Sequence, residues 1–315
     1  MATRVAAVVV TYEPSIPAAR ELLQALAPQV DSLVVVDNGS EPALVAELAG
    51  IVTRLSGETE LIELGENTGI AAAQNLGIAW ARERRAGMVL LSDQDSIPAP
   101  DMVARLVAGL AAAQEETGSG AVPGRPGRVA AVGPVTVDER AEGTTLLFED
   151  RRWGPRRAPV PESDGALVPV SFLIASGCLI TMEALDAVGP MNEAWFIDHI
   201  DLEWGLRARR AHFSLFGVAG ASLGHHLGDR MTRIPGRERA VHIHSPVRNY
   251  YMARNTLLLM GSGLLPRTWW WGYLFWIGKY AAFYAFACRP RLKRARLLLR
   301  GLLDGLRGRS GRLSV

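Results

Sequence analysis

The 315-residue chain is predicted to be an α/β protein with a doubly wound, mostly parallel sheet. Three observations predict this fold. Short apolar runs alternate with segments of helical spacing, which is the pattern of consecutive β-α-β units. The runs at 5–10, 33–36 and 88–91 are apolar throughout, as expected of strands that are covered on both faces. Polar residues follow the runs, as at the ligand-binding edge of such a sheet.

The predicted strands of the N-terminal half lie at residues 5–10, 33–36, 61–64 and 88–91. Helical spacing occupies residues 18–27, a segment that starts near Pro42, and residues 67–84, where Asn67 or Thr68 is the expected N-cap. Farther along we expect helices at 101–116, 183–188, 201–211 and 246–260, and β structure at 168–181. We also expect a Gly/Pro loop at 117–128, an irregular excursion at 138–168 with a hairpin near 144–148, and a charged loop at 228–240.

Charge is distributed unevenly along the chain. Residues 264–315 hold eleven Lys or Arg and one acid, which leaves 23 basic and 31 acidic residues before them. A basic tail beside an acidic body suggests an anionic surface as partner. The two cysteines, Cys178 and Cys288, show no metal-ligand spacing, and this favours a reducing compartment. The first apolar run is too short to be the core of a signal peptide.

Three polar clusters follow predicted strands, and in a parallel sheet they share one edge. They comprise Thr11, Tyr12 and Glu13; Asp37 and Asn38; and Asp93, Gln94 and Asp95. No GxGxxG or GxxxxGK[ST] motif accompanies them, which argues against a dinucleotide-binding or P-loop domain. Asp93 and Asp95 offer hard oxygen ligands for a Mg²⁺ or Mn²⁺ that holds a diphosphate. Asp37 could accept a hydrogen bond from a pyrimidine N3–H. Polar turns or helix caps are the alternative for each cluster taken singly.

Two further groups of residues suggest chemistry. Gly69 would let a ligand approach the start of a helix that carries the amides of Gln74 and Asn75, although a polar face that contacts solvent is the alternative for these amides. Asp198, His199 and Asp201 lie among aromatic residues, where a partly buried carboxylate could act as a general base, although acids that complement a helix dipole are the alternative.

Cationic and imidazole side chains complete the set of candidates. His225 could be a third metal ligand, and a structural histidine is the alternative. Arg248 and Arg254 could clamp phosphate oxygens in bidentate fashion, and ordinary surface charge is the alternative.

In this order, VVVTYEP, VVVDNGS, ENTGIAAAQNLGIAWA, LSDQD, ASGCLI, FIDHIDLEWGLRAR, HHLGD and HSPVRNYYMARN resemble the family 2 glycosyltransferases, over residues 5–260. FIDHIDLEW and HSPVRNYYMARN are similar to the bacterial rhamnosyltransferases that use dTDP-L-rhamnose. The resemblance implies a GT-A fold, a divalent metal (Mg²⁺ or Mn²⁺) and inversion at the anomeric carbon. Residues 1–100 would be the nucleotide-sugar-binding half, 101–263 the acceptor-binding and catalytic half, and 264–315 a helical tail.

The resemblance also implies roles for individual residues. The nucleotide-sugar site would be formed by Thr11, Tyr12, Glu13, Asp37, Asn38, Asn67, Gly69, Gln74, Asp93 and Gln94, with Arg248 and Arg254 facing the diphosphate. Asp93 and Asp95 match the DXD motif, Asp95 is the expected direct metal ligand, and His225 falls where a metal-binding histidine is expected.

The chain departs from the family pattern at the position of the base. Many relatives carry Glu-Asp or Asp-Asp there, whereas this chain has Asp198-His199. The base is therefore expected to be Asp198, with His199 and Asp201 as alternatives.

The expected activity is transfer of L-rhamnose from dTDP-L-rhamnose to a glycan or lipid-linked glycan in cell-surface polysaccharide synthesis. A different donor, such as UDP-galactofuranose, and a non-catalytic nucleotide-sugar-binding scaffold are the alternatives. The tail is aromatic at 269–277 and basic after 288, which favours an anionic membrane surface over an oligomer interface. We expect a peripheral or monotopic protein on the cytoplasmic face of the plasma membrane, and no nucleic-acid partner.

Overall fold

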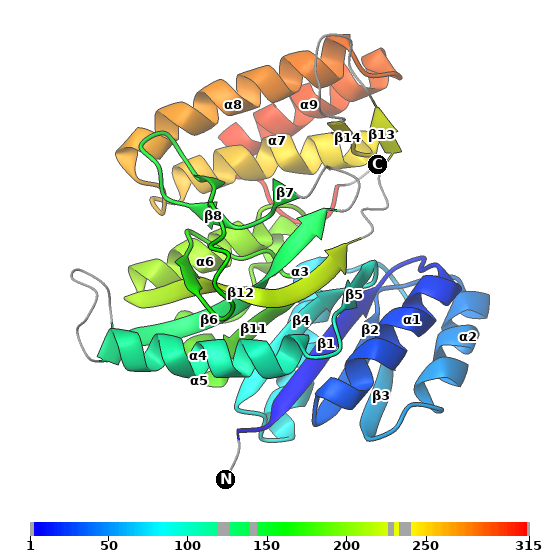
Figure 1. Ribbon diagram of the computed structural model, residues 1–315. Coiled ribbons are helices and arrows are strands. Elements are labelled where there is room, and N and C mark those ends of the chain that lie inside the picture. Colours follow the sequence, from blue (N-terminus) through cyan, green and yellow to red (C-terminus); the bar gives the residue numbers. More distant parts are fainter. Residues whose placement is uncertain (1–2, 119–126, 139–143, 226–229, 233–240, 314–315) are drawn as a thin grey trace.

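A central sheet with helices on both faces carries a layer of three helices at one edge (Figure 1). The computed structural model describes residues 3–118, 127–138, 144–225, 230–232 and 241–313. In Figure 1 the three C-terminal helices lie above the sheet, and the N-terminus lies at the opposite end.

The N-terminal half supplies four parallel strands. They are β1 (Val5–Thr11), β2 (Ser32–Asp37), β3 (Glu58–Glu63) and β4 (Met88–Asp93), in the spatial order β4-β1-β2-β3. In the register of the sheet, Thr11 lies opposite Asp37 and Val10 lies opposite Asp93. The polar clusters that follow these strands therefore meet at one edge, as the sequence predicted.

Helices cover both faces of this half, which explains the continuous apolar runs of β1, β2 and β4. Ala7 and Val9 of β1 pack with α1 (Ile16–Leu26), α2 (Pro42–Val52) and α4 (Met102–Gly118). Ala6 and Val8, which alternate with them, pack with α3 (Ile70–Glu83), α5 (Met182–Val188) and α6 (Ile200–Arg210). All four of these strand residues are fully or almost fully buried, which makes both faces of the sheet core.

The C-terminal half extends the sheet with strands of mixed direction. Its members are β5 (Ser96–Pro98), β6 (Arg128–Asp138), β7 (Thr144–Thr145), β10 (Leu167–Pro169), β11 (Cys178–Thr181) and β12 (Phe213–His225). β11 runs antiparallel to β4 and β6, whereas β6 and β12 are parallel. The predicted α/β fold with a mostly parallel sheet is confirmed, and this mixed half is the part that the sequence did not specify.

The long strand β6 was not predicted, because Gly133 and Pro134 interrupt its apolar pattern. Proline cannot donate to a sheet, and the partner strand β12 shifts its register beside it, between Val218 and Ser222. Gly133 leaves room for Leu173, whose Cδ2 would lie 2.6 Å from an added Cβ.

The predicted irregular excursion contains a hairpin, β8 (Phe148–Glu149) paired with β9 (Arg156–Arg157). Other short elements are the 3₁₀ turns Ala27–Gln29 and Glu193–Trp195 and the pair β13 (Arg230–Thr232) and β14 (Val241–Ile243). The predicted loop at 228–240 lies largely outside the described residues.

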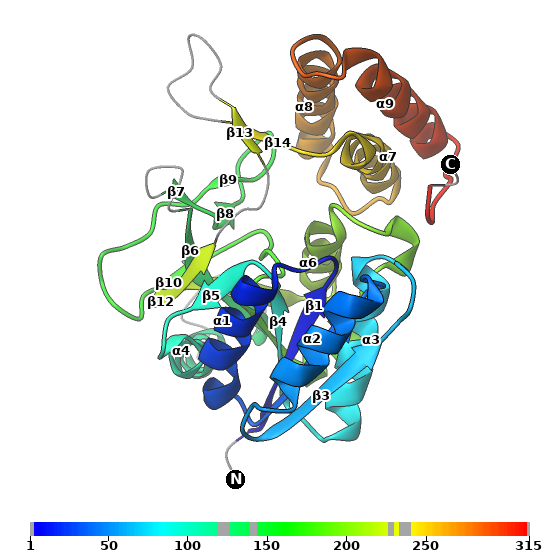
Figure 2. The same cartoon turned by 90° about the vertical axis from the view of Figure 1, so that its right-hand side faces the viewer.

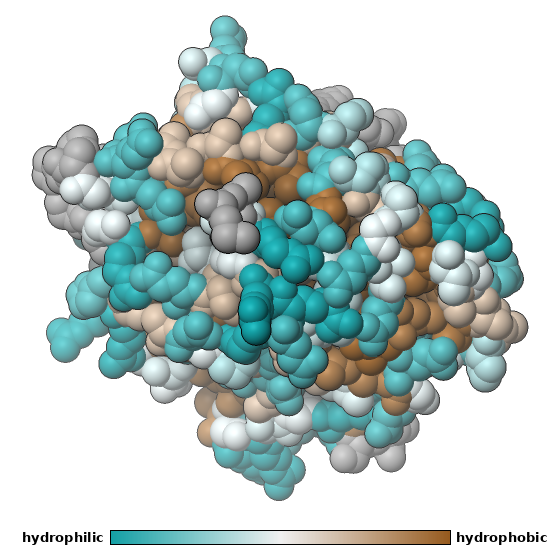
Figure 3. Space-filling model, turned by 90° about the horizontal axis from the view of Figure 1, so that it is seen from below, coloured by the Kyte–Doolittle hydropathy of each residue, from teal (hydrophilic) through white to brown (hydrophobic). Residues whose placement is uncertain are grey.

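The C-terminal layer consists of α7 (Pro246–Gly261), α8 (Arg267–Phe286) and α9 (Arg291–Leu306) (Figure 2). Two glycines let α9 approach α7, since a Cβ on Gly301 would lie 2.4 Å from the Tyr250 carbonyl oxygen and one on Gly305 2.7 Å from that of Arg254. Within the described part of the chain, no helix combines the length and the apolar character needed to cross a membrane. On the opposite side of the molecule, hydrophilic side chains cover much of the face shown in Figure 3.

Candidate active site

A cavity of about 540 Å³ lies at the edge where the parallel strands end, and Arg248 of α7 is among its lining residues. It brings together residues from both halves of the chain. Of the residues predicted from the sequence, it is lined by Tyr12, Asn38, Asn67, Gly69, Gln74, Asp93, Gln94, Asp95, Asp198, His199, Asp201 and Arg248. The convergence of distant acids that the sequence suggested is therefore present in the structure.

Asp37 does not line this cavity, and its carboxylate is engaged by its own loop. Oδ2 accepts hydrogen bonds from the hydroxyls of Thr11 and Ser40, and Oδ1 accepts from the backbone N–H groups of Gly39 and Ser40. Four donors fill the lone-pair sites of a carboxylate. Asp37 and Thr11 therefore shape the loop that carries Asn38, in place of the expected contact with a base.

Glu13 also lies outside the residues that line the cavity. Its backbone N–H donates to the Ser40 hydroxyl, and its carboxylate accepts from the backbone N–H of Glu41. These contacts join the loop after β1 to the loop after β2. Glu13 thus holds two loops of the site together.

Arg254 is the clearest departure from the expected site. Its guanidinium is 1% exposed and donates to the carbonyl oxygens of Trp195 and Gly311 and to Oδ1 of Asn255. A guanidinium with these partners inside the protein does not reach a diphosphate in the cavity. The spacing of Arg248 and Arg254 suggested a shared role, but only Arg248 lines the cavity.

Amide side chains organise the predicted nucleotide end. Gln94 pairs with the backbone of Tyr12, accepting from its N–H at 2.7 Å and donating to its carbonyl at 3.1 Å. Asn38 donates to Oδ1 of Asn67 and accepts from the backbone N–H of Thr68. The loops after β1, β2, β3 and β4 are thereby cross-linked at one edge of the sheet.

Gly69 connects this end to residues 195–199, the segment just before α6, which we call the acidic loop. It has a φ of +94°, and a Cβ added there would lie 2.7 Å from the carbonyl oxygen of Phe196. The next backbone N–H, of Ile70, donates to that same oxygen at 2.9 Å. Gly69, rather than the expected Asn67 or Thr68, is the N-cap of α3. The start of the helix is therefore occupied in part by the acidic loop.

The acidic loop has a strained backbone. Phe196, Asp198 and His199 all have a positive φ, between 64° and 69°. Such conformations cost on the order of 1 kcal/mol each and persist only where surrounding contacts impose them. Here Asn255 imposes them, since its Nδ2 lies within 2.7 to 3.0 Å of the carbonyl oxygens of Trp195, Ile197 and Asp198. Sequence reasoning missed Asn255, although it is the last residue of the HSPVRNYYMARN stretch that the sequence analysis singled out.

Asp198 pairs with Arg248. The guanidinium donates from Nη2 to Oδ1 at 2.6 Å, and the side chain of Asp198 is 3% exposed. Arg248 itself is about one-third exposed, so it faces both the carboxylate and the cavity.

The DXD pair has the chemistry of a cation site. Burial, together with the carboxylates of Asp95 and Asp201, raises the pKa of Asp93 to about 7. The hydroxyl of Ser176 accepts from the backbone N–H of Asp93, which fixes the end of β4. An excess of buried negative charge with hard oxygen donors fits Mg²⁺ or Mn²⁺.

The third predicted metal ligand is placed only by its backbone. His225 ends β12 and lies in register with Ser96, the residue after Asp95. Among the side chains that the structure describes, no group of three or more His, Cys, Asp or Glu gathers as a metal cluster. Within the described residues, Asp93 and Asp95 are therefore our candidate oxygen ligands for a cation.

Asp201 and His199 lie two residues apart and are both half-buried, but they differ electrostatically. Burial raises the pKa of Asp201 to about 6 and lowers that of His199 to about 4. Nε2 of His199 lies 2.9 Å from the Thr256 hydroxyl, which donates its proton to the carbonyl of Met252. The imidazole must then be the donor from Nε2, and it is neutral near pH 7.

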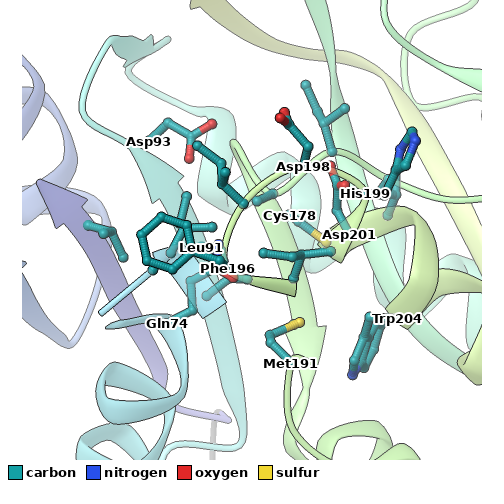
Figure 4. A pocket seen from close by; sticks show the side chains of 18 of the residues that line it. Gln74, Leu91, Asp93, Cys178, Met191, Phe196, Asp198, His199, Asp201 and Trp204 are labelled. Carbon is teal, nitrogen blue, oxygen red and sulfur yellow. The ribbon is translucent and has the colours of Figure 1, made fainter. Parts of the chain in front are cut away.

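The acids occupy one end of the cavity and apolar side chains the other. Figure 4 shows Asp93 and Asp198 near the top and Met191 and Trp204 toward the bottom. Leu91 and Cys178 line the wall between them. The cavity can therefore hold a ligand whose anionic end is joined to the acids through a cation and whose other end is apolar.

Comparisons with known proteins identify the family of the chain. Residues 6–187 match the model of the family "Glycosyl transferase family 2". The chain is 31% identical over 266 residues to the dTDP-rhamnosyl transferase RfbF of Shigella flexneri, covering 84% of this chain and 83% of that protein.

Two solved structures share the fold at lower identity. A structure of GalNAc-T7 with UDP, GalNAc and Mn²⁺ superposes with a TM-score of 0.60 at 13% identity, covering 97% of this chain, which spans 56% of that one. TarS 1-349 of S. aureus in complex with UDP-GlcNAc superposes with a TM-score of 0.56 at 14% identity, covering 96% of this chain and 81% of that one. The chain belongs to glycosyl transferase family 2 and has the GT-A fold.

Proposed function

We propose that the protein transfers L-rhamnose from dTDP-L-rhamnose to a saccharide hydroxyl, with a divalent metal and with inversion at the anomeric carbon. The observation that carries this proposal is the convergence of Asp93 and Asp95 with Asp198 and Asp201 on one cavity. The similarity to RfbF supports the choice of nucleotide and sugar.

The lining of the cavity favours a 6-deoxy sugar. Its inner end is formed by apolar side chains, among them Leu91, Ile180, Met191 and Trp204. Rhamnose carries a methyl group at C6, whereas galactofuranose and common hexoses carry a hydroxyl there. A buried hydroxyl without a partner costs binding free energy, so this wall discriminates in favour of the methyl group.

The polar end would hold the nucleoside diphosphate. Asn38, Asn67 and Tyr12 offer hydrogen-bonding groups for the nucleoside, and Arg248 offers a guanidinium for the phosphates. Asp93 and Asp95 would hold Mg²⁺ or Mn²⁺, with His225 as a further candidate ligand. A metal held there would supply Lewis-acid stabilisation of the departing diphosphate.

Three residues remain candidates for the base, and we favour Asp201. The sequence pointed to Asp198, but one oxygen of that carboxylate is paired with Arg248. His199 is a poor base at neutral pH because its pKa is low and its Nε2 is engaged by Thr256. Asp201 lines the cavity, and a pKa of about 6 leaves it mostly ionised at pH 7 yet more basic than an ordinary aspartate.

In this reaction the base removes the proton of an acceptor hydroxyl as its oxygen bonds to the anomeric carbon. The bond from that carbon to the diphosphate oxygen breaks, and the nucleoside diphosphate leaves from the opposite face. Arg248 stabilises the negative charge that develops on the diphosphate. The proton ends on the carboxylate of Asp201.

A thermal-shift panel tests the donor. The full chain is mixed with Mn²⁺ or Mg²⁺ and with dTDP-L-rhamnose, UDP-galactofuranose, UDP-glucose or GDP-mannose. Ligands that bind only the folded state raise the melting temperature. We expect the largest shift with dTDP-L-rhamnose; a larger shift with UDP-galactofuranose would replace the proposed donor. Binding without any release of nucleotide or transfer would support the scaffold alternative.

We further propose that α8 and α9 attach the protein to an anionic membrane surface, in a peripheral or monotopic way on the cytoplasmic face. Both helices expose apolar side chains: Leu274, Phe286, Leu292, Leu299 and Leu306. The basic residues of α9 are suited to anionic headgroups. Sedimentation with phosphatidylglycerol vesicles but not with phosphatidylcholine vesicles is the expected result. A concentration-dependent dimer that does not bind vesicles would favour the oligomer interface instead.

A further inference from the structure

A second cavity of about 710 Å³ adjoins the first and has a different chemistry. It lies between α8 and the hairpin formed by β8 and β9, and we call it the aromatic cavity. Trp153, Trp271, Phe275 and Trp276 line it, and they are 39% to 70% exposed. Large aromatic faces left open inside a concave site are typical of ligand sites.

The walls of the aromatic cavity are held in fixed positions. Nε1 of Trp269 donates to the carbonyl of Arg151 at 2.8 Å, which ties the start of α8 to the hairpin. Gly272 allows the close approach of the two segments, because a Cβ there would lie 1.8 Å from the Trp153 carbonyl oxygen. Phe148 and Phe172 stack with their ring centroids 5.1 Å apart on the other wall. The shape of the aromatic cavity is therefore determined by these packing contacts of the fold.

The two cavities meet at the candidate catalytic residues. His199 and Asp201 line both of them. The ring of His199 also approaches two aromatic rings of α8, with centroid distances of 6.4 Å to Tyr273 and 6.1 Å to Trp276. A ligand in the aromatic cavity would have its inner end at Asp201, on the side away from the DXD pair.

We infer that the aromatic cavity binds the acceptor saccharide, with a pyranose ring packed on Trp271 and Phe275 and a hydroxyl directed to Asp201. This inference rests on the proposed function and assigns to α8 a part of the substrate site. A pyranose ring has faces of C–H groups that pack on aromatic rings, while its hydroxyls remain available at the edges. The carboxylate of Asp201 can accept a hydrogen bond from such a hydroxyl, and the aromatic side chains of the cavity wall can pack on the C–H faces.

A hydrocarbon chain fits this cavity less well. Its inner end would lie against Asp201 and His199, and its course would pass the charged residues Arg156 and Lys279, which also line the cavity. Lys279 holds its ammonium 5.5 Å from the centroid of the Phe275 ring, so positive charge lies at this wall. Charged groups beside a hydrocarbon lose hydration without compensation. The mixed lining favours a polar ligand with apolar faces.

The test compares two substitutions of the same kind on one helix. Phe275 lines the aromatic cavity and is 70% exposed, whereas Phe286 lies on the same helix outside it and is 76% exposed. The full chain, Phe275→Ala and Phe286→Ala are titrated without vesicles, using methyl pyranosides of rhamnose, glucose, galactose and N-acetylglucosamine. The readout is tryptophan fluorescence, to which Trp153, Trp271 and Trp276 contribute from the cavity wall.

We expect saturable binding of at least one pyranoside to the unaltered chain and to Phe286→Ala. Phe275→Ala should bind it about tenfold more weakly, equivalent to about 1.4 kcal/mol of binding free energy. No response to any pyranoside, or equal weakening in both variants, would overturn the inference. The titration needs no donor, so a failure of dTDP-L-rhamnose to bind would be a separate result, against the proposed function.

Discussion

Arg248 and Asp198 form an ion pair in which only one carboxylate oxygen is used. Nη2 of Arg248 donates to Oδ1 at 2.6 Å, while Oδ2 is buried and forms no hydrogen bond within the described part of the chain. The pair joins α7 to the acidic loop at the polar end of the cavity. Arg248 therefore stabilises the loop, and its exposed part faces the cavity in which we propose that the diphosphate binds.

Removing Arg248 should lower stability and donor affinity together. Arg248→Ala leaves the Asp198 carboxylate buried without its counter-charge, and we expect a loss of about 2 kcal/mol in the free energy of unfolding, less than for a fully buried pair because the guanidinium is partly exposed. Urea unfolding measures this loss. Adding Asp198→Ala to Arg248→Ala should restore most of the stability but not the donor affinity measured by calorimetry. Recovery of both would argue against a role for Arg248 in binding the diphosphate.

The base can be identified by comparing two isosteric substitutions. Asp201→Asn should lower kcat about 10²- to 10⁴-fold, the usual contribution of a general base, with an unchanged affinity for the donor. Asp198→Asn should have a smaller effect on kcat, since that carboxylate is paired with Arg248. Steady-state transfer rates and donor calorimetry provide the two readouts. If Asp201→Asn keeps near-normal turnover while Asp198→Asn loses it, Asp198 is the base.

Gly69→Ala should disrupt the contact between α3 and the acidic loop. Gly65 offers a matched control, since it also has a positive φ but an added Cβ would meet nothing within 4 Å. Gly65→Ala should cost about 1 kcal/mol of stability through backbone strain alone. Gly69→Ala should cost at least about 2 kcal/mol, because its Cβ also collides with the carbonyl oxygen of Phe196. Equal unfolding free energies in the two variants would show that the contact is unimportant.

His199 should make the protein less stable in mild acid. Burial lowers its pKa from 6.5 to about 4, so between these values the unfolded chain binds a proton that the folded chain does not. Stability is therefore fully present above pH 6.5 and falls as the pH decreases toward 4. Between pH 7 and pH 5, the unaltered chain should lose about 2 kcal/mol more than His199→Gln does. Urea titrations at both pH values measure this difference, and identical losses would mean that the imidazole is not held neutral.

The N-terminal half of the site could be predicted because its elements are determined locally. Continuous apolar runs set the strands, and the residues at or just after the ends of β2 and β4 reach the cavity. Asn38 and Asp93 were predicted for that reason. Asp37 was also predicted to bind a ligand, because the sequence shows that it lies at this edge. The sequence does not show that Thr11, Gly39 and Ser40 donate hydrogen bonds to its carboxylate.

The remaining features depend on contacts between distant segments. Arg254 and Asn255 follow one another in the chain, yet both turn to the acidic loop some 60 residues earlier, as shown by their hydrogen bonds to the Trp195 carbonyl. The aromatic cavity requires α8 to pack on the hairpin of β8 and β9, and nothing in either segment alone specifies that pairing. The same aromatic residues suggested only a membrane or subunit interface from the sequence.

The account depends most directly on the metal-dependent use of dTDP-L-rhamnose at the DXD pair. The decisive measurement is release of dTDP from dTDP-L-rhamnose, with the pyranosides as acceptors, by the unaltered chain and Asp95→Ala in Mn²⁺ or in EDTA. Asp101→Asn, a change at an exposed carboxylate paired with Arg105, is the control. We predict release by the unaltered chain and the control in Mn²⁺ only, and little release by Asp95→Ala. Equal rates in EDTA, or full activity of Asp95→Ala, would contradict the account.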